Sequence, residues 1–361
     1  MGIKDAKTAG NSTLLELGMD SLMGTEIKQT LEINFDVVMS PQDIRSLTFA
    51  KLQELGNSSQ NSGTTVKSET TKKDPPLQDK ATSDSSDSPA DVSETRVVPA
   101  SSIRKLKTKS TNESTPVFLV HPVQGTVELL EEIASKVTRP VWGLECSEGA
   151  PMNSAQDLAS HYVQMVRDKQ AKGPYTMLAY SLGSVFGLEM AIKLEAEGEK
   201  VSLTLLDGSP DFVKGHIGIY YRNQINTANL DAFRWPYVTM LFTNKDYNLL
   251  SRELRELPTP ADRSRRCSEL LGCSEKTFLK AVELFWRKLE ICKDYKPSGK
   301  LKSRLRLLKA SENFVSNVGP DYDLSQYCES SVEVITIPGT THQTIITGKA
   351  ADRVAQLLNA S

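Results

Sequence analysis

Several features that would assign a protein to a class by composition are absent from this sequence. No apolar run is long enough to span a membrane, and the N-terminus has no apolar signal-peptide segment. The 43 basic and 45 acidic residues nearly cancel, so no overall charge favours nucleic acid. The five cysteines are odd in number and lack CxxC or metal-ligand spacing, which indicates free thiols in a reducing compartment. We therefore expect a cytoplasmic protein without a metal, a membrane segment or a nucleic-acid partner.

Large apolar residues are also scarce, at a hydrophobic share of 39%, and their absence is concentrated in one segment. Residues 57–114 consist mainly of Ser, Thr, Asp, Lys and Pro. Such a composition cannot bury enough surface to offset the entropy of ordering the chain. We expect a disordered, flexible linker there, with at most a short docking segment formed by Arg96–Pro99 and Ile103, and a solvated patch at basic residues such as Arg104 and Lys105. The linker separates residues 1–56 from residues 115–361.

The most informative stretch of the second part is centred on Ser181. A largely apolar run, Tyr175–Tyr180, meets this serine, and a helical pattern follows from Gly183. Small residues at Ala179 and Gly183 leave room for a strand to fold back onto a helix. This pattern predicts a nucleophile elbow, in which a strained turn exposes the serine hydroxyl. The alternative is an ordinary strand-to-helix turn with a capping serine.

Apolar runs and helical patterns alternate through residues 115–361. The apolar runs lie at 117–120, 141–144, 175–180, 201–206, 305–308 and 332–337. Such alternation predicts a parallel sheet covered by helices on both faces and, with the elbow, an α/β hydrolase domain. Residues 212–300 contain no obvious strand, and helical periodicity is visible over residues 220–241, 247–257 and 274–295. We interpret them as a helical lid insertion that borders a groove for an acyl chain, or alternatively as a helical subdomain without a ligand.

A serine nucleophile needs a base, and the base needs an acid to orient it. His342 follows the last strand, where hydrolases of this topology place the base; the other histidines are His121, His161 and His216. Two acids compete, because Asp207 follows the strand after the elbow helix and Glu312 follows the next strand. The residues alone leave both acids open. For the oxyanion hole we expect the N–H of Leu182 and an N–H from the loop after the first strand.

Residues 1–56 show two helical patterns and a motif, Leu17–Met23, that reads LGMDSLM. This motif resembles that of acyl carrier domains, whose serine in Asp-Ser-Leu carries 4'-phosphopantetheine. The resemblance implies an all-α carrier domain, a covalent cofactor on Ser21 and a phosphopantetheinyl transferase as a partner. The alternative is that Ser21 is only a first-turn residue beside a capping Asp20. Carrier domains begin with a further helix, which we expect to be missing here, so that the carrier domain is truncated.

The hydrolase part resembles the thioesterase domain of animal fatty acid synthase. Four stretches carry this resemblance: Phe118–Pro122, Ala179–Gly183, Asp207–Pro210 and Gly339–His342. It implies that Asp207 is the acid of a triad with Ser181 and His342, and that Val123 or Gln124 supplies the second oxyanion N–H. The sequence departs from the family pattern at Ala179, where glycine is usual, and at Thr340-Thr341, where Gly-Asp is usual. These departures leave the triad residues in place.

A carrier domain, a linker and a thioesterase in this order are similar to the C-terminal region of animal fatty acid synthase. The resemblance implies hydrolysis of a long-chain fatty acyl thioester on the carrier arm, which terminates fatty acid synthesis. It also implies upstream synthase domains and a homodimeric full-length synthase. Two alternatives remain at this point: release of a product from a related animal polyketide synthase, and a carrier and docking fragment whose hydrolase domain is inactive. A general lipase is disfavoured because it would not account for the carrier segment.

Overall fold

A computed structural model of the chain describes residues 13–14, 27, 39, 41–48, 50–51, 96–109, 114–225, 230–243, 245–312 and 318–360. The chain divides into two compact units, of which the first contains α2 (Pro41–Ser46) and the second contains the sheet. In the first unit, Leu14, Ile44 and Leu47 are buried. Ser21 lies outside the described residues, as do most of residues 1–56 and the linker residues 57–95.

The second unit is built on one sheet, whose strands in the described residues follow the order β1-β3-β2-β4-β5-β6-β7. The strands are β1 (Ile103–Leu106), β2 (Val117–Val120), β3 (Val141–Leu144), β4 (Tyr175–Tyr180), β5 (Val201–Leu206), β6 (Leu305–Ala310) and β7 (Val332–Ile337). From β3 to β7 all neighbouring strands are parallel, and β1 runs antiparallel to β3 at the edge. The six apolar runs are thus strands of a mainly parallel sheet, as predicted.

The expectation of a disordered linker up to residue 114 was wrong for the segment that forms β1. Leu106 is buried in the core, whereas Lys105 is exposed. Arg104 pairs with Glu131 at 2.8 Å and with Glu145 at 3.3 Å, so the basic patch is partly an ion-pair network. The sequence did not indicate this strand, because an edge strand needs only a few apolar residues and tolerates charges on its open side.

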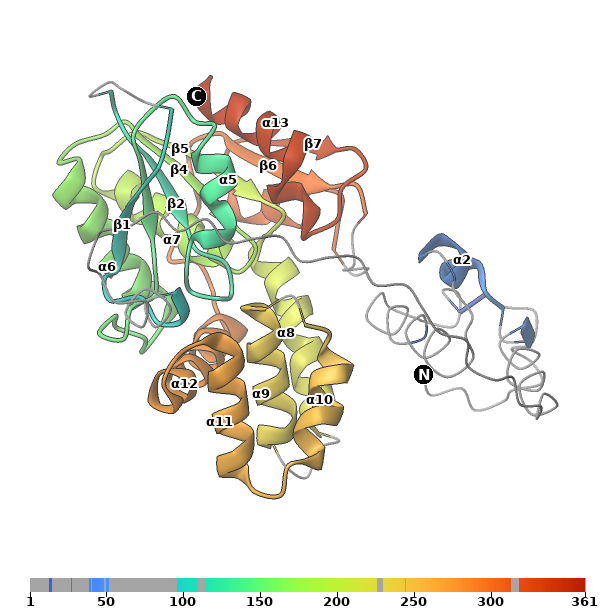
Figure 1. The fold of residues 1–361 in the computed structure, drawn as a ribbon. Coiled ribbons are helices and arrows are strands. Elements are labelled where there is room, and N and C mark those ends of the chain that lie inside the picture. Colours follow the sequence, from blue (N-terminus) through green and yellow to red (C-terminus); the bar gives the residue numbers. More distant parts are fainter. Residues whose placement is uncertain are drawn as a thin grey trace, which may run out of the picture. The chain divides into compact units, whose positions relative to one another are not determined.

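Helices cover both faces of the sheet, as the alternation predicted (Figure 1). On one face, α5 (Glu131–Ala134) and α13 (Gly348–Asn359) pack against a buried cluster that includes Leu119, Leu178 and Leu308. On the other face, α6 (Ala155–Lys169) and α7 (Gly183–Ala196) pack against each other and α7 contacts the central strands. Residues of β2 and β4 are buried on both faces, which agrees with their continuous apolar runs.

Five helices between β5 and β6 form a bundle at one end of the sheet (Figure 1). They are α8 (Pro210–Ile225), α9 (Leu230–Leu241), α10 (Tyr247–Glu256), α11 (Pro260–Leu271) and α12 (Glu275–Lys293). The sequence predicted the helical insertion but not α11, whose polar and charged composition hides its buried face. Its start is nevertheless marked by capping Thr259 followed by Pro260. None of the helices in the described residues is both long enough and apolar enough to cross a membrane.

Candidate active site

Ser181 lies in a sharp turn between β4 and α7 and has the geometry of a nucleophile elbow. Its φ angle is 55°, a conformation that a non-glycine residue adopts at a cost in energy. The backbone N–H of Ser181 donates to the carbonyl of Leu206 at 3.0 Å, which anchors the turn to β5. A Cβ atom at Gly183 would lie 2.4 Å from the carbonyl oxygen of His121. Only glycine therefore allows α7 to start this close to the loop after β2.

The alanine that replaces the usual elbow glycine is accommodated from the opposite side. A Cβ atom at Gly187, on the second turn of α7, would lie 2.5 Å from the methyl group of Ala179. Ala179 itself is fully buried. The strand and the helix thus remain in close contact because a glycine on the helix faces the alanine on the strand.

We expect Gly187→Ala to destabilise the domain by about 1–3 kcal/mol, because an added methyl overpacks the contact between β4 and α7. The double variant Ala179→Gly with Gly187→Ala should recover most of this loss, since it moves the methyl from strand to helix. Urea unfolding of the three proteins would measure the two free-energy changes. Equal stabilities of Gly187→Ala and the unsubstituted protein would contradict this packing argument.

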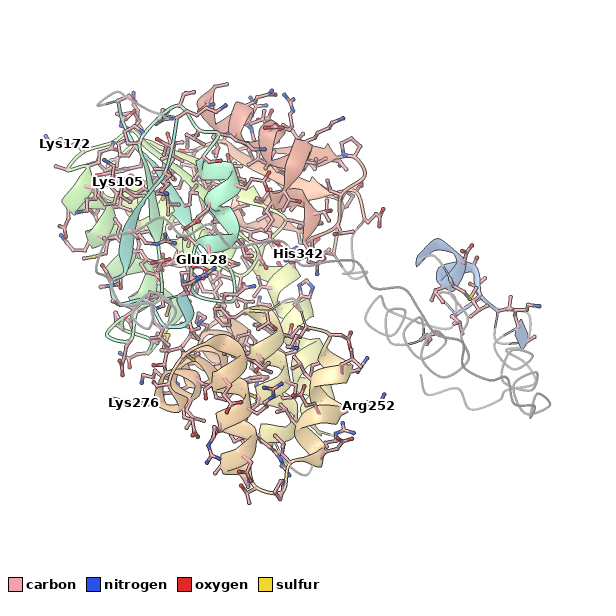
Figure 2. The ribbon with its side chains drawn as sticks, viewed as in Figure 1. Lys105, Glu128, Lys172, Arg252, Lys276 and His342 are labelled. Atoms are coloured by element: carbon pink, nitrogen blue, oxygen red, sulfur yellow. The ribbon has the colours of Figure 1, made fainter. Side chains whose placement is uncertain are left out.

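His342 lies between Ser181 and Asp207, although these residues come from three separate loops. Its Nε2 atom is 2.9 Å from Ser181 Oγ, and its Nδ1 atom is 2.7 Å from Asp207 Oδ2. Because the carboxylate accepts from Nδ1–H, Nε2 carries the lone pair that faces the serine hydroxyl. Tyr180 stacks on the imidazole at 5.0 Å between ring centroids and donates its hydroxyl to the backbone carbonyl of His342 at 2.6 Å. Figure 2 shows His342 where the sheet region meets α8.

Asp207 is held by more hydrogen bonds than the sequence indicated. Its Oδ1 atom accepts from the N–H of Ala310 and from the hydroxyl of Tyr322, both at 2.8 Å. The carboxyl side chain is 1% exposed. Burial alone would raise the pKa of Asp207, but the hydrogen bonds from His342, Ala310 and Tyr322 lower it below its usual value. Tyr322 was missed because it follows a turn far along the chain and belongs to no motif.

Among the described residues, the carboxylate that contacts the imidazole of His342 is that of Asp207, and no contact with the second acid, Glu312, is recorded. Glu312 follows β6 as expected, but it is exposed. Its backbone N–H donates to the carbonyl of Thr340 at 2.9 Å, which ties the loops after β6 and β7 together. Asp207 therefore occupies the position next to His342 in this structure.

The loop after β2 forms a tight turn beside Ser181. The carbonyl of Pro122 accepts from the N–H of Gly125 at 3.0 Å, which places Val123 and Gln124 at the centre of the turn. Within the described residues, no acceptor is recorded for the N–H groups of Val123, Gln124 and Leu182, the three donors expected to form the oxyanion hole. These donors are thus available to an oxygen atom bound between the turn and the elbow.

A buried histidine supports this turn. His121 Nδ1 lies 2.6 Å from the carbonyl of Pro122, so Nδ1 carries the proton and donates it. The unprotonated Nε2 then accepts from the hydroxyl of Tyr162 on α6 at 2.7 Å. Burial, together with the charge of Lys288, lowers the pKa of His121 to about 3. His121 therefore stays neutral at physiological pH and acts as a rigid spacer.

We expect the stability of the domain to fall as the pH drops below 6.5. The unfolded chain binds a proton at His121 near that pH, whereas the folded protein does not until the pH approaches 3. Between pH 7 and pH 5 this single group removes about 2 kcal/mol of unfolding free energy. Denaturant unfolding at several pH values would measure the slope. A His121→Gln variant should show a shallower slope, and an unchanged slope would contradict the assignment.

The remaining histidines lie apart from the hydrogen-bonded chain of Ser181, His342 and Asp207. His161 on α6 is 2.8 Å from the hydroxyl of Ser102. His216 on α8 comes within 5.8 Å of His342 between ring centroids, and Phe212 lies 5.5 Å from His342. The insertion therefore borders the imidazole through α8, which the sequence had suggested only in general terms.

Comparisons with known proteins agree on a two-part organisation. Residues 115–361 match the family model of the thioesterase domain, and residues 1–57 match the model of the phosphopantetheine attachment site. A covalently attached 4'-phosphopantetheine on a serine of this segment follows from the second match.

Similar curated proteins are large synthases. Microperfuranone synthase of Emericella nidulans is 26% identical over 248 residues, covering 62% of this chain and 25% of that protein. The nonribosomal peptide synthetase acyN of Ascocoryne sarcoides is 25% identical over 214 residues, covering 55% of this chain and 22% of that protein. The polyketide synthase PksR of Bacillus subtilis is 32% identical over 99 residues, covering 26% of this chain and 4% of that protein. The chain thus spans a quarter or less of these relatives.

Solved structures support the fold. A four-domain nonribosomal peptide synthetase aligns with a TM-score of 0.56 at 17% identity, covering 97% of this chain and 24% of that one. The Vlm2 thioesterase domain aligns with a TM-score of 0.50 at 19% identity, covering 72% of this chain and 97% of that one. At such identities the likeness concerns the fold alone, and it confirms the predicted α/β hydrolase architecture.

Proposed function

This chain belongs to the thioesterase-domain family, and from that premise we propose that it hydrolyses a long-chain fatty acyl thioester carried on its own carrier segment. Ser181 is the nucleophile, His342 the base and Asp207 the orienting acid. Ser21 is the attachment point of the carrier arm, a role that rests on the LGMDSLM motif within the matched residues 1–57. The reaction releases a free fatty acid and ends chain synthesis.

The observation that carries this proposal is the unbroken hydrogen-bonded chain from Ser181 Oγ through His342 to Asp207. His342 Nε2 takes the hydroxyl proton as Ser181 Oγ attacks the thioester carbonyl carbon. The resulting oxyanion accepts hydrogen bonds from Leu182 and from Val123 or Gln124. The carbon–sulfur bond then breaks, and the proton held by His342 passes to the departing thiol.

The same residues complete the second half of the reaction. Water enters after the thiol has left, and His342 takes its proton as the oxygen attacks the acyl-serine ester. Collapse of the second oxyanion breaks the bond to Ser181 Oγ, which recovers its proton from His342. Asp207 stays ionised throughout, in line with its lowered pKa, and stabilises the imidazolium in both halves.

The fatty acyl specificity rests on the resemblance of the four motifs to the thioesterase of animal fatty acid synthase. The helical insertion, which borders His342 through Phe212 and His216, is the proposed wall of the acyl site. A second candidate is release of a polyketide or peptidyl product, which is favoured by the similarity to a nonribosomal peptide synthetase and a polyketide synthase. In both candidates the chain acts at the end of an assembly line with upstream synthase domains, and the full-length synthase is proposed to be a homodimer.

Kinetic comparison of thioesters on the full chain tests the proposal. N-acetylcysteamine thioesters of short, medium and long saturated fatty acids would be compared with β-ketoacyl and dipeptidyl thioesters, and mass spectrometry would follow the acylated Ser181 peptide. We expect the highest kcat/KM for long saturated chains. Preference for the ketoacyl or dipeptidyl substrates would support the second candidate. Absence of both turnover and acylation of Ser181 would instead indicate an inactive hydrolase domain.

A further inference from the structure

Lys288 is a buried lysine that has no counter-ion among the described residues, and it lies directly behind the turn that carries Val123 and Gln124. Its side chain comes from α12 of the insertion and is 1% exposed. Among the described residues, its only recorded hydrogen bond runs to the carbonyl of Leu284 on its own helix, at 3.1 Å, and its ionisable neighbours include no carboxylate. Lysine is rarely buried in this way without a partner, because removing its charge from water is costly.

The lysine contacts the turn at its glycine. A Cβ atom at Gly125, whose φ angle is 89°, would lie 3.0 Å from Lys288 Nζ and 3.4 Å from Lys288 Cε. The glycine therefore leaves the space that the end of the lysine occupies. The carbonyl of the same glycine accepts from the N–H of Cys146 at 2.7 Å, so this hydrogen bond holds the turn in place beside the lysine.

The ionisable groups around Lys288 do not supply a negative charge. Burial raises the pKa values of the Cys146 and Cys292 thiols, so both are neutral at physiological pH. His121 is also buried and neutral. Burial lowers the pKa of the Lys288 ammonium. A positive charge on this side chain is therefore destabilising in the resting protein.

We propose that Lys288 supplies a buried positive charge that stabilises the oxyanion formed on Ser181, acting from behind the oxyanion turn. The inference rests on the proposed function, which provides the missing negative charge at the moment when the carbonyl oxygen becomes an oxyanion. An interaction that exists only in the tetrahedral state raises kcat without tightening substrate binding. The site is thus built at the expense of resting stability, a known conflict between stability and activity.

The test is Lys288→Met in the full chain, with Lys276→Met as the matched control. Methionine is unbranched and similar in length, so it removes the charge while filling the space. Lys276 lies on the same helix with an exposed side chain, and it is labelled in Figure 2. Measurements would comprise kcat and KM for a long-chain acyl thioester, the melting temperature, and the affinity for an alkyl boronic acid, which forms a tetrahedral anion on a serine nucleophile.

For Lys288→Met we expect kcat to fall about tenfold, KM to stay within about twofold and boronate affinity to fall by the same factor as kcat. The melting temperature should rise, because an unpaired buried charge has been removed. A purely structural lysine would give the opposite sign in the melting temperature. An unchanged kcat, a lowered melting temperature or a variant that does not fold would overturn the inference.

The unsubstituted protein separates this inference from the proposed function. If it hydrolyses the thioester and binds the boronate while Lys288→Met matches it in both, only the role of Lys288 fails. If the unsubstituted protein does neither, the proposed function fails and this inference fails with it. Lys276→Met should behave like the unsubstituted protein in every measurement.

Discussion

Ser181→Ala should abolish thioester hydrolysis while the protein remains folded. The loss expected in kcat is on the order of 10⁴-fold or more, because neither water nor a neighbouring group can form the acyl intermediate at that position. Substrate binding should change little, since the turn and the insertion remain in place. Steady-state kinetics with a long-chain acyl thioester would give kcat and KM. Labelling with a fluorophosphonate probe would show whether the reactive serine hydroxyl has been removed.

Ser184→Ala provides the control within the same helix. Ser184 is fully buried, and its hydroxyl has no hydrogen-bond partner within the described residues. Removing this hydroxyl should leave kcat and probe labelling unchanged and should not lower the melting temperature. Retention of substantial activity by Ser181→Ala, or loss of labelling only in Ser184→Ala, would reject Ser181 as the nucleophile. Circular dichroism of both variants would show whether any loss reflects unfolding.

Much of the second unit could be predicted because its strands are local apolar runs. The strand that meets Ser181 and the strand Val201–Leu206 are buried along their whole length or nearly so, and their composition reports this directly. Strand β1 was missed because its charges, Arg104 and Lys105, give a short edge strand the composition of a linker.

The motif residues of the site could be predicted from the sequence, whereas the residues that surround and hold them could not. Ser181, Asp207 and His342 each follow a strand, so a parallel sheet brings them to one edge. Their separations along the chain carry no information on which acid meets the histidine, and only the folded loops distinguish Asp207 from Glu312. Tyr322 and Lys288 lie far from any motif, and their roles depend on burial and hydrogen bonds that no sequence pattern reports.

The packing around the elbow also explains why alanine is tolerated at position 179, where the family pattern has glycine. Glycine is usual at the position of Ala179, whose methyl group adds bulk where the strand meets the helix. The structure places Gly187 opposite its methyl group, so one small residue replaces another across the contact. Position 187 shows no abnormal pattern in the sequence, and this exchange becomes visible only when strand and helix are packed together.

Asp207→Asn and Glu312→Gln should differ strongly in their effect on kcat. In Asp207→Asn the Oδ1 atom can still accept from Ala310 and Tyr322, which directs the amide NH₂ towards His342 Nδ1. Nδ1 must then accept, so the proton moves to Nε2 and the imidazole can no longer take the proton of Ser181. We expect kcat to fall on the order of 10³- to 10⁴-fold.

Glu312→Gln keeps the backbone hydrogen bond to Thr340 and changes only an exposed side chain, so kcat should stay within about twofold. Steady-state kinetics of both variants, with melting curves to verify folding, compare the two acids directly. A large loss in Glu312→Gln with little change in Asp207→Asn would transfer the orienting role to Glu312. Equal losses in both would mean that the hydrogen bond from His342 to Asp207 does not control the tautomer. The two isosteric substitutions thus test the hydrogen-bonded chain at its buried end, where one proton decides whether Ser181 is activated.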